Sequence, residues 1–211
     1  MITLYDCATA PSPRRARILL AEKQVPHDTV AVDLRSGEQL SESFRRINPL
    51  CTVPALRLDS GQVLTDNASI AAYLEAAFPE PPLMGVTPEE KAEVAHWHWR
   101  AEFEGLMAVG ETLRNRSPAM AGRALPGPVN YAQIPELAER GMARLRQFLD
   151  DLEQRLAVEP YLATGRFSLA DITAVVAVDF ARIIQIRPEP ERHPALLRWR
   201  ARLAERPSMA L

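Results

Sequence analysis

INPLCTVPALRLDSGQVLTDNASIAAYLE, the stretch from Ile47 to Glu75, decides the fold of this chain. Apolar and β-branched residues at 53–58 and 62–65 flank the polar turn Asp59-Ser60-Gly61, a pattern typical of a β-hairpin. The apolar residues that follow at helical spacing are Ile70, Leu74 and Phe78. The stretch therefore predicts strand, turn, strand and helix in succession.

The start of this predicted helix is suited to binding an anion. Asp66 and Asn67 follow the second strand, and short polar side chains of this kind cap helix N-termini. A helix start also leaves backbone N–H groups unpaired, and together with the helix dipole they attract a carboxylate. Val53-Pro54 stands at the entry to the first strand, where a proline has no ladder hydrogen bond to lose. The hairpin and the helix start together predict a cradle for a small ligand.

Three motifs in this stretch resemble the glutathione S-transferase family. They are N-P-x-x-x-V-P-x-L from Asn48, D-x-G-x-x-L from Asp59, and an acidic residue with a small polar residue at the helix start. The resemblance implies that the backbone of Val53 pairs with the cysteinyl part of glutathione, ahead of Pro54, which is cis in the family. It also implies that Asp66 and Asn67 hold the γ-glutamyl carboxylate and ammonium.

The same resemblance adds two supporting residues and contains two departures. Gln39 matches a position that often meets the glycine carboxylate of glutathione, and Thr52 is similarly placed. A solvated loop residue is the alternative for each. Asn67 stands where the family usually has Ser, although an amide still donates and accepts hydrogen bonds. Cys51 stands where the family usually has Gly, which leaves the form of the turn before Val53 open.

The composition excludes several classes of function. The chain has 211 residues, 47% of them hydrophobic, and its net charge of −2 gives no reason to expect nucleic acid or an anionic membrane as the main partner. Two cysteines, Cys7 and Cys51, form neither a disulfide framework nor a metal cluster, so we expect no metal and a reducing cytoplasm. Met1 is followed by no basic region and no long apolar run, which predicts neither a signal peptide nor a membrane span.

Residues 1–78 are expected to form one α/β domain. Strands at 2–7 and 27–34, the second of them half-buried, flank a helix at 14–23 with Pro13 at its first position. The hairpin and its helix complete the order β-α-β-α-β-β-α. That order resembles the thioredoxin-like, glutathione-binding half of a glutathione transferase.

Residues 79–87 contain three prolines and one glycine and mark a linker between domains. The remaining residues, 88–211, resemble the all-helical C-terminal domain of the family. One long helix is expected at 88–116, interrupted only by Gly105 and Gly110.

Two later motifs strengthen the resemblance to the helical domain. Ser168 stands three residues before Asp171, ahead of an apolar run, which is close to a capping box and to a helix-capping motif of the family. Trp199 followed by Arg206-Pro207-Ser208 resembles the ending of the family's final helix. A single apolar stripe predicts a further helix through Leu145, Phe148, Leu149, Leu152 and Leu156.

A glutathione transferase must favour the thiolate of its substrate over the thiol, whose ordinary pKa is about 8.5. The family places a Tyr, Ser or Cys donor in the loop after the first strand, here residues 8–13. Counting back from Arg17, which matches an Arg of the family's first helix, the Ser or Cys position falls on Ala10 and the Tyr position near Thr9. Ser12 or Thr9 is therefore the candidate catalytic hydroxyl, and a plain helix N-cap is the alternative role of Ser12.

A second hypothesis about the group that donates to the thiolate comes from the run A-x-A-P-x-P-x-R-x-R, which begins at Ala8. This run resembles the Gtt2-like fungal and bacterial transferases, a class that lacks the usual residue. The resemblance implies that water held by groups of the helical domain replaces it. The candidate groups on the long helix are His98, Arg100, Glu102 and Glu104.

Taken together, the resemblance implies a cytoplasmic homodimer that adds the glutathione thiolate to small hydrophobic electrophiles lying against the long helix. A different class of function is a non-catalytic binding or regulatory module with the same fold, which the missing side chain at Ala10 favours. A third is glutathione-dependent reduction of disulfides or peroxides through Cys7 or Cys51. The absence of a C-x-x-C pair at Cys7 disfavours disulfide exchange.

Overall fold

The computed structural model describes every residue from Met1 to Leu211, and the chain divides into two compact units. Unit 1 comprises residues 1–81 and 125–130 with Leu211, and unit 2 comprises residues 82–124 and 131–210. Unit 1 contains the β-sheet, and unit 2 is helical. No helix in the structure combines the length and the apolar character that crossing a membrane requires.

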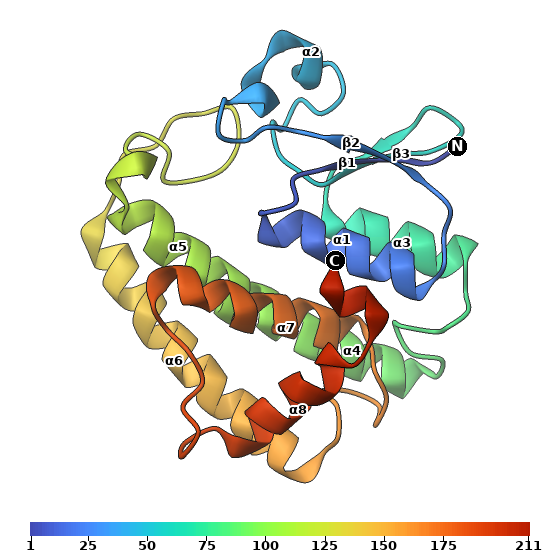
Figure 1. Cartoon of the computed structure of the whole chain (residues 1–211), viewed down its shortest axis with the longest axis vertical. Helices are drawn as coiled ribbons and strands as arrows, with labels where there is room; N and C mark the ends of the chain where they lie inside the picture. Colours follow the sequence, from blue (N-terminus) through green and yellow to red (C-terminus); the bar gives the residue numbers. More distant parts are fainter. The chain divides into compact units, whose positions relative to one another are not determined.

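Unit 1 has the predicted thioredoxin-like arrangement. Its elements are β1 Thr3–Asp6, α1 Pro11–Glu22, β2 Asp28–Ala31, α2 Glu42–Arg45, β3 Ala55–Arg57, β4 Val63–Leu64 and α3 Asn67–Ala77. The strand order is β2-β1-β3-β4, in which β1 and β2 are parallel and β3 is antiparallel to both of its neighbours. Figure 1 shows α1 and α3 side by side on one face of the sheet, with α2 on the other side.

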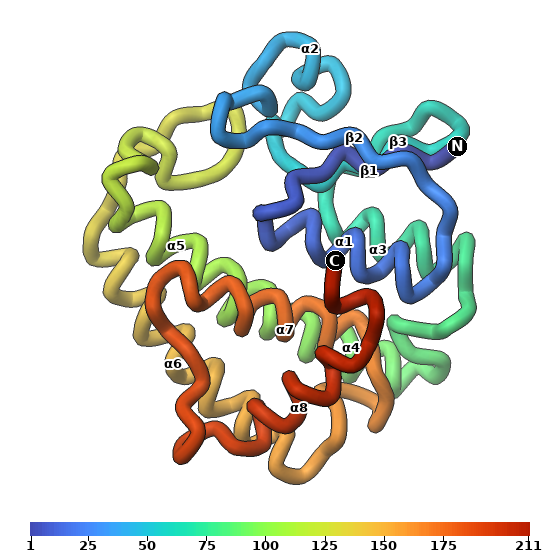
Figure 2. Tube along the Cα trace, in the orientation of Figure 1, coloured from blue at the N-terminus to red at the C-terminus, as the bar shows by residue number.

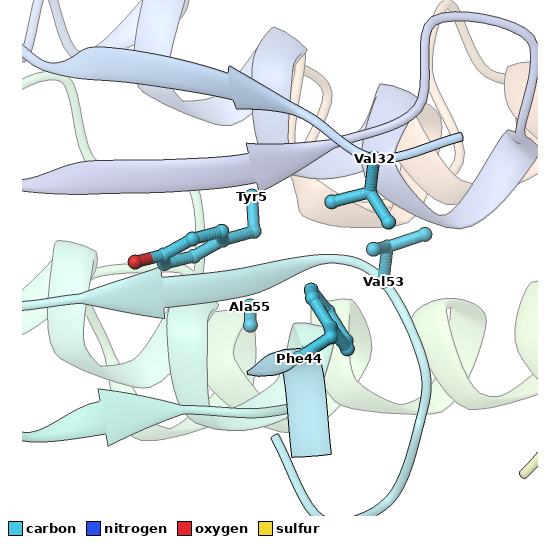
Figure 3. Close-up of a cluster of buried hydrophobic side chains, with 5 residues drawn as sticks. All are labelled: Tyr5, Val32, Phe44, Val53 and Ala55. Atoms are coloured by element: carbon cyan, nitrogen blue, oxygen red, sulfur yellow. The ribbon is translucent and has the colours of Figure 1, made fainter. Parts of the chain in front are cut away.

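A cluster of buried side chains fixes the chain just before β3 (Figure 3). Tyr5 of β1 and Phe44 of α2 meet edge to face, with their ring centroids 6.2 Å apart. The cluster is completed by Val32, Val53 and Ala55. Because the side chain of Val53 is held in this core, its backbone has a fixed place at the entry to β3.

Helix α1 begins three residues earlier than the sequence predicts. Its first residue is Pro11 and its N-cap is Ala10, so the predicted start at Arg14 after a first-position Pro13 is wrong. Prolines are tolerated in a first turn because the N–H groups there have no intrahelical partner. The two prolines that indicated a loop therefore belong to the helix.

Strand β2 is shorter and more exposed than predicted. It spans Asp28–Ala31 instead of 27–34, and all four of its residues are exposed. β2 is an edge strand whose one neighbour in the sheet is β1. The alternation of apolar and polar residues correctly predicted a strand here, but the predicted half-burial is wrong.

Unit 2 consists of helices, as the sequence predicts. Its main elements are α4 Pro88–Arg100, α5 Met107–Arg116, α6 Pro135–Val158, α7 Leu169–Phe180 and α8 Pro194–Ala204. Figure 2 traces the chain through them, including the irregular connection between α5 and α6. Every residue of α7 from Leu169 to Val178 is buried, because this helix lies in the core of the unit.

The predicted long helix at 88–116 is continuous, and a π-helical segment, Ala101–Leu106, joins α4 to α5. Gly105 lies in this segment, where an added β-carbon would be 2.9 Å from both the Ala177 Cβ and the Phe148 ring. Its missing side chain therefore permits close packing. Gly110 lies within regular α5, so the interruption predicted at this residue is wrong.

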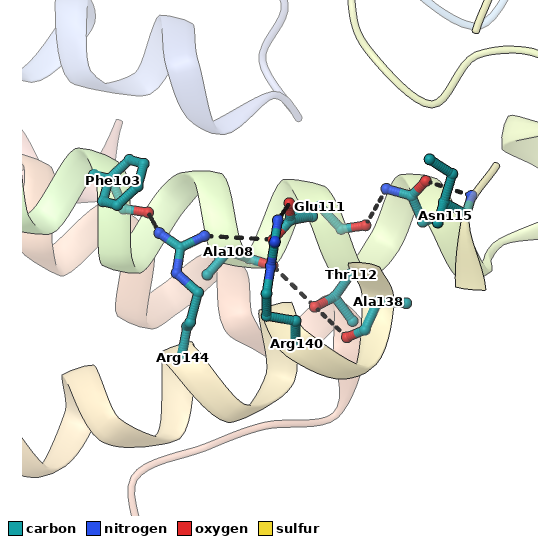
Figure 4. A network of polar contacts seen from close by, with 9 residues as sticks. Phe103, Ala108, Glu111, Thr112, Asn115, Ala138, Arg140 and Arg144 are labelled. Atoms are coloured by element: carbon teal, nitrogen blue, oxygen red, sulfur yellow. Dashed lines mark hydrogen bonds and ion pairs between the residues drawn. The ribbon is translucent and has the colours of Figure 1, made fainter. Parts of the chain in front are cut away.

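Helices α5 and α6 pack closely around Thr112 (Figure 4). The Thr112 hydroxyl lies 2.9 Å from the Ala108 carbonyl oxygen and 3.2 Å from the Ala138 carbonyl oxygen on α6. A β-carbon added to Gly141 would lie 2.5 Å from the Thr112 Oγ1. The two helices can approach this closely because α6 has no side chain at that point.

A buried carboxylate, Asp171, joins the start of α7 to α8. It accepts hydrogen bonds from the Ser168 N–H at 3.0 Å, the Ser168 hydroxyl at 2.9 Å, the Trp199 Nε1–H at 2.9 Å and the Leu162 N–H at 3.1 Å. Burial raises the pKa of Asp171 to about 6, while these donors act in the opposite direction. The capping interaction expected between Ser168 and Asp171 is confirmed.

Candidate functional site

The candidate site is built around the turn that leads into Val53. Asn48 is fully buried, and its Oδ1 accepts the Leu50 N–H at 2.9 Å. Its Nδ2 donates to the Thr52 carbonyl oxygen at 2.8 Å and contacts the Thr52 Oγ1 at 3.2 Å. One amide side chain therefore fixes the whole turn. Sequence analysis did not assign this role to Asn48, although Asn48 opens the N-P-x-x-x-V-P-x-L motif that could have indicated it.

Cys51 occupies the tightest point of the same turn. Its backbone has φ +55°, a left-handed conformation that glycine adopts without strain and other residues adopt at some cost. Its N–H still closes the turn on the Asn48 carbonyl oxygen at 3.0 Å, and its side chain is buried. Cys51 therefore keeps the turn closed in a backbone conformation that is strained for a residue with a side chain.

Val53 presents a backbone that no other part of the protein engages. The Val53-Pro54 bond is cis, and neither the N–H nor the C=O of Val53 makes a hydrogen bond within the protein. Buried or partly buried backbone groups almost always have a partner in native structures. An extended peptide lying along this residue would supply one.

The register of the sheet places the other candidates on both sides of Val53. β3 pairs with β4 through Leu56 opposite Leu64. Because this pairing is antiparallel, the residues just before β3, including Val53, lie at the same end of the sheet as the residues that follow β4. On the other side, β1 pairs with β3 antiparallel through Tyr5 opposite Ala55, so the residues that follow β1 lie at this end of the sheet too. The end of β1 and the start of α3 thus flank Val53 at one end of the sheet.

Asp66 and Asn67 form the start of α3. Asp66 is the N-cap, and its Oδ1 accepts the Ser69 N–H at 2.8 Å while its Oδ2 accepts the Ser69 hydroxyl at 3.1 Å. Asn67 is half-buried, and its side-chain amide makes no hydrogen bond within the protein. A carboxylate, a free amide and the N–H groups of a helix start suit the ammonium and carboxylate of an amino acid.

Thr52 lies in the turn before Val53, and Gln39, in a different segment, has an unsatisfied group. Gln39 lies in a short 3₁₀ turn, Glu38–Leu40, after Gly37 in a left-handed conformation. Its side-chain Oε1 is buried and has no hydrogen-bond partner in the protein. A buried polar atom without a partner is costly, so this group fits a site that a ligand completes.

The loop between β1 and α1 is held by Arg17. Its guanidinium pairs with Asp6 at 2.5 Å and donates to the carbonyl oxygens of Cys7 at 3.4 Å and Ala8 at 3.1 Å. The Ala10 N–H adds a hydrogen bond to the Cys7 carbonyl oxygen at 3.0 Å. The ion pair is mostly buried, so it fixes the path of the loop toward the first turn of α1.

The two candidate hydroxyls differ in their surroundings. Thr9 is exposed, and its Oγ1 lies 3.6 Å from the Cys7 Sγ. Ser12 is the second residue of α1, so the alternative in which it is the N-cap is wrong. The Ser12 Oγ accepts a hydrogen bond from the Arg15 Nη2 at 3.2 Å, which leaves its O–H free to donate. Because prolines occupy the first and third positions, Ser12 also carries the one N–H among the first three residues of the helix.

The alternative donors on the long helix belong to unit 2 and are engaged there. The His98 Nδ1 lies 2.9 Å from the Thr173 hydroxyl. Arg100 pairs with Glu104 at 2.8 Å and also with Asp151. These pairs order the side chains along the helix, and none of them identifies a thiolate donor.

Two parts of the chain match models of known protein families. Residues 9–77 match the family model described as glutathione S-transferase, N-terminal domain, and residues 117–207 match glutathione S-transferase, C-terminal domain. Glutathione S-transferase 2 of Saccharomyces cerevisiae is 33% identical over 98% of this chain and 87% of its own length.

Solved structures agree with the sequence comparison. The crystal structure of Gtt2 from Saccharomyces cerevisiae has a TM-score of 0.88 at 32% identity and covers 99% of this chain and 98% of that one. A glutathione S-transferase domain-containing protein from Marinobacter aquaeolei has a TM-score of 0.86 at 34% identity, with 98% of this chain and 99% of that one covered. The similarity therefore extends over both units.

Proposed function

Because this chain belongs to the glutathione S-transferase family, we propose that it conjugates the thiol of glutathione to small hydrophobic electrophiles. In this reaction the thiol proton passes to solvent and the sulfur attacks an electrophilic carbon. A carbon–sulfur bond forms, and the leaving group departs with its electron pair. We further propose that the protein acts as a homodimer, which the family implies and which light scattering would test.

One observation carries this proposal: Val53, whose backbone makes no hydrogen bond within the protein, lies at the end of the sheet from which β4 leads to the acidic start of α3. Glutathione is an extended peptide with a free amino acid at one end. Its cysteinyl backbone would pair with Val53, and its γ-glutamyl end would lie against Asp66 and Asn67. Gln39 and Thr52 would support the glycyl end, where the buried Gln39 Oε1 could accept a hydrogen bond from the glycyl N–H and its amide N–H could donate to the carboxylate.

The thiolate would be stabilised at the start of α1. β1 ends beside the start of β3, so the loop after β1 lies at the same end of the sheet as Val53. Ser12 offers a hydroxyl whose oxygen already accepts from Arg15, and it also offers a backbone N–H at a helix start. Donors of this kind lower the pKa of a thiol by favouring its charged form.

Calorimetry with glutathione, followed by a conjugation assay with an aryl halide, tests the proposed function. We expect glutathione to bind and the conjugate to form faster than in buffer alone. A matched control is the dipeptide Cys-Gly, which lacks the γ-glutamyl group and should bind much more weakly. If glutathione does not bind, or if it binds and no conjugate forms, transferase activity is refuted.

A second candidate function is a binding module without turnover. Ala10 is the N-cap of α1 and has no side-chain hydrogen bond, so the position that carries the family's Ser or Cys supplies no donor. Binding of glutathione without conjugation by either the parent protein or any Ser12 variant would favour this alternative. Conjugation by the parent protein would exclude it.

A further inference from the structure

The loop that connects α5 to α6 contains a segment, Leu125–Asn130, that belongs to unit 1 although both flanking stretches belong to unit 2. Two backbone hydrogen bonds join the chain just before this segment to the chain just after it. The Ala124 N–H donates to the Tyr131 carbonyl oxygen at 3.2 Å, and the Tyr131 N–H donates to the Gly122 carbonyl oxygen at 3.1 Å. Pro126 and Pro128 stiffen the segment Leu125–Asn130, because each proline ring fixes its own φ. The segment is therefore a short, closed strap and not a free linker.

The tip of this strap lies against the turn that leads into Val53. Gly127 is buried, and a β-carbon added there would lie 3.6 Å from the Leu50 carbonyl oxygen. Gly127 has φ +117°, a conformation that residues with a side chain rarely adopt. A glycine at this point therefore lets the strap follow the surface of the turn.

That turn needs support from outside itself. Cys51 is held at φ +55°, and strained backbone of this kind persists only where the surrounding structure enforces it. Asn48 provides one restraint from within the turn, through its bonds to Leu50 and Thr52. The strap provides a second, because it packs on the carbonyl oxygen of the residue just before Cys51.

The contact between strap and turn is shallow. Leu50, Leu125 and Val129 are 53%, 52% and 53% exposed, so large apolar side chains on both partners remain in contact with water. A contact that buries little apolar surface has a low local free energy of opening. The strap can therefore open without unfolding the rest of the unit, and a ligand that stabilises the turn would close it.

We propose that Leu125–Asn130 is a glutathione-linked clasp, in which Gly127 positions the turn 48–52 for the ligand. The proposal rests on the proposed function, because it assigns glutathione to Val53 and Thr52 at the end of that turn. The clasp and the ligand stabilise the same backbone conformation, so each strengthens the binding of the other by the same factor. Gly127 is a positioning residue that does not touch the reacting atoms.

Hydrogen exchange on the unmodified protein is the first test. The amides that can report on the clasp are those of Leu125, Gly127, Val129 and Asn130, because its prolines have none. We expect saturating glutathione to slow exchange in this segment and to leave residues 117–121 of the same connection unchanged. Equal exchange with and without glutathione would overturn the proposal.

The second test compares two glycines of the same connection. Gly122 and Gly127 both have positive φ, but an added β-carbon would have nothing within 4 Å at Gly122. We expect Gly127→Ala to weaken glutathione binding about fivefold or more, whereas Gly122→Ala leaves the dissociation constant unchanged. The turnover rate at saturating glutathione should be the same in both variants.

The outcomes separate the clasp from the proposed function. If the parent protein binds no glutathione, the proposed function is refuted and the clasp with it. If the parent binds and both glycine variants bind equally well, the clasp alone is refuted. Circular dichroism would identify a Gly127→Ala protein that does not fold, and the exchange measurement on the parent then decides.

Discussion

Asp66 has two roles that a single substitution can separate. As the N-cap of α3 it accepts from Ser69, and as a carboxylate it would pair with the γ-glutamyl ammonium. We expect Asp66→Asn to keep the cap and the free energy of unfolding but to weaken glutathione binding about tenfold or more, because a charged hydrogen bond is lost. Asp66→Ala should lose a similar affinity and about 1 kcal/mol of stability as well. Calorimetry and urea unfolding give both quantities, and unchanged affinity of both variants would contradict the assignment.

Ser12 should affect the chemical step and not the binding step. We expect Ser12→Ala to bind glutathione as the parent does and to lower turnover about tenfold or more, because one donor to the thiolate is lost. The pH–rate profile should move to higher pH, since the thiol pKa in the complex rises without that donor. Thr9→Val is the matched control, and we expect it to leave both quantities unchanged. A Ser12→Ala enzyme with the parent profile would point to water as the donor.

Asp171 makes stability depend on pH in an unusual direction. Burial raises its folded-state pKa from 3.8 to about 6, so between these values the folded protein binds more protons than the unfolded protein. This group therefore lowers the free energy of unfolding as pH rises, by about 2 kcal/mol from pH 4 to pH 7. We expect the parent's stability relative to Asp171→Asn to fall by that amount over this window in urea titrations. A constant difference between the two proteins would show that Asp171 titrates normally.

At the scale of elements, the packing of α5 on α6 depends on a missing side chain. A β-carbon on Gly141 would lie 2.5 Å from the Thr112 Oγ1 and 2.7 Å from the Ala108 carbonyl oxygen. We expect Gly141→Ala to lower the free energy of unfolding by about 1–3 kcal/mol through overpacking. Gly110→Ala is the control within α5, where nothing lies within 4 Å, and it should stabilise the protein by about 0.5–1 kcal/mol. Equal effects of the two substitutions, measured by urea unfolding, would contradict this packing.

The positions of helices and strands were predictable where a sequence pattern is compatible with only one kind of structure. The hairpin around Asp59-Ser60-Gly61 and the helix start at Asp66 lie where turn and capping residues indicate. The start of α1 was not predictable from its prolines, because proline is favoured both in loops and in a first turn. The π-helical segment at 101–106 was not predictable either, because no local pattern indicated it, although Gly105 within it packs closely against α7.

The candidate site was predictable only in part, because its backbone geometry comes from contacts between distant segments. Val53, Asp66 and Asn67 were proposed from a motif, and the antiparallel pairing of β3 with β4 explains why the segments that carry them lie at one end of the sheet. The role of Asn48 in the turn is local and its motif could have indicated it, whereas the strap at 125–130 has no local signal. Tertiary contacts place the strap, so the sequence alone indicated only a proline-rich loop at these residues.

At the scale of the whole molecule, ligand binding should raise thermal stability by mass action. Glutathione at 100 times its dissociation constant would add about 2.7 kcal/mol to the free energy of unfolding. For a chain of this length we expect the melting temperature to rise by about 5–10 °C in scanning calorimetry. Cys-Gly at the same concentration should give almost no rise, because it cannot reach Asp66 and Asn67. Equal shifts with both peptides would contradict recognition of the γ-glutamyl end.

A crystal structure of the protein with glutathione bound is the most direct test of the central claim. We predict that the cysteinyl N–H and C=O pair with the backbone of Val53 and that the γ-glutamyl group contacts Asp66 and Asn67. The sulfur should then lie at the first turn of α1. Glutathione bound at another place, or an empty site at saturating concentration, would contradict the account.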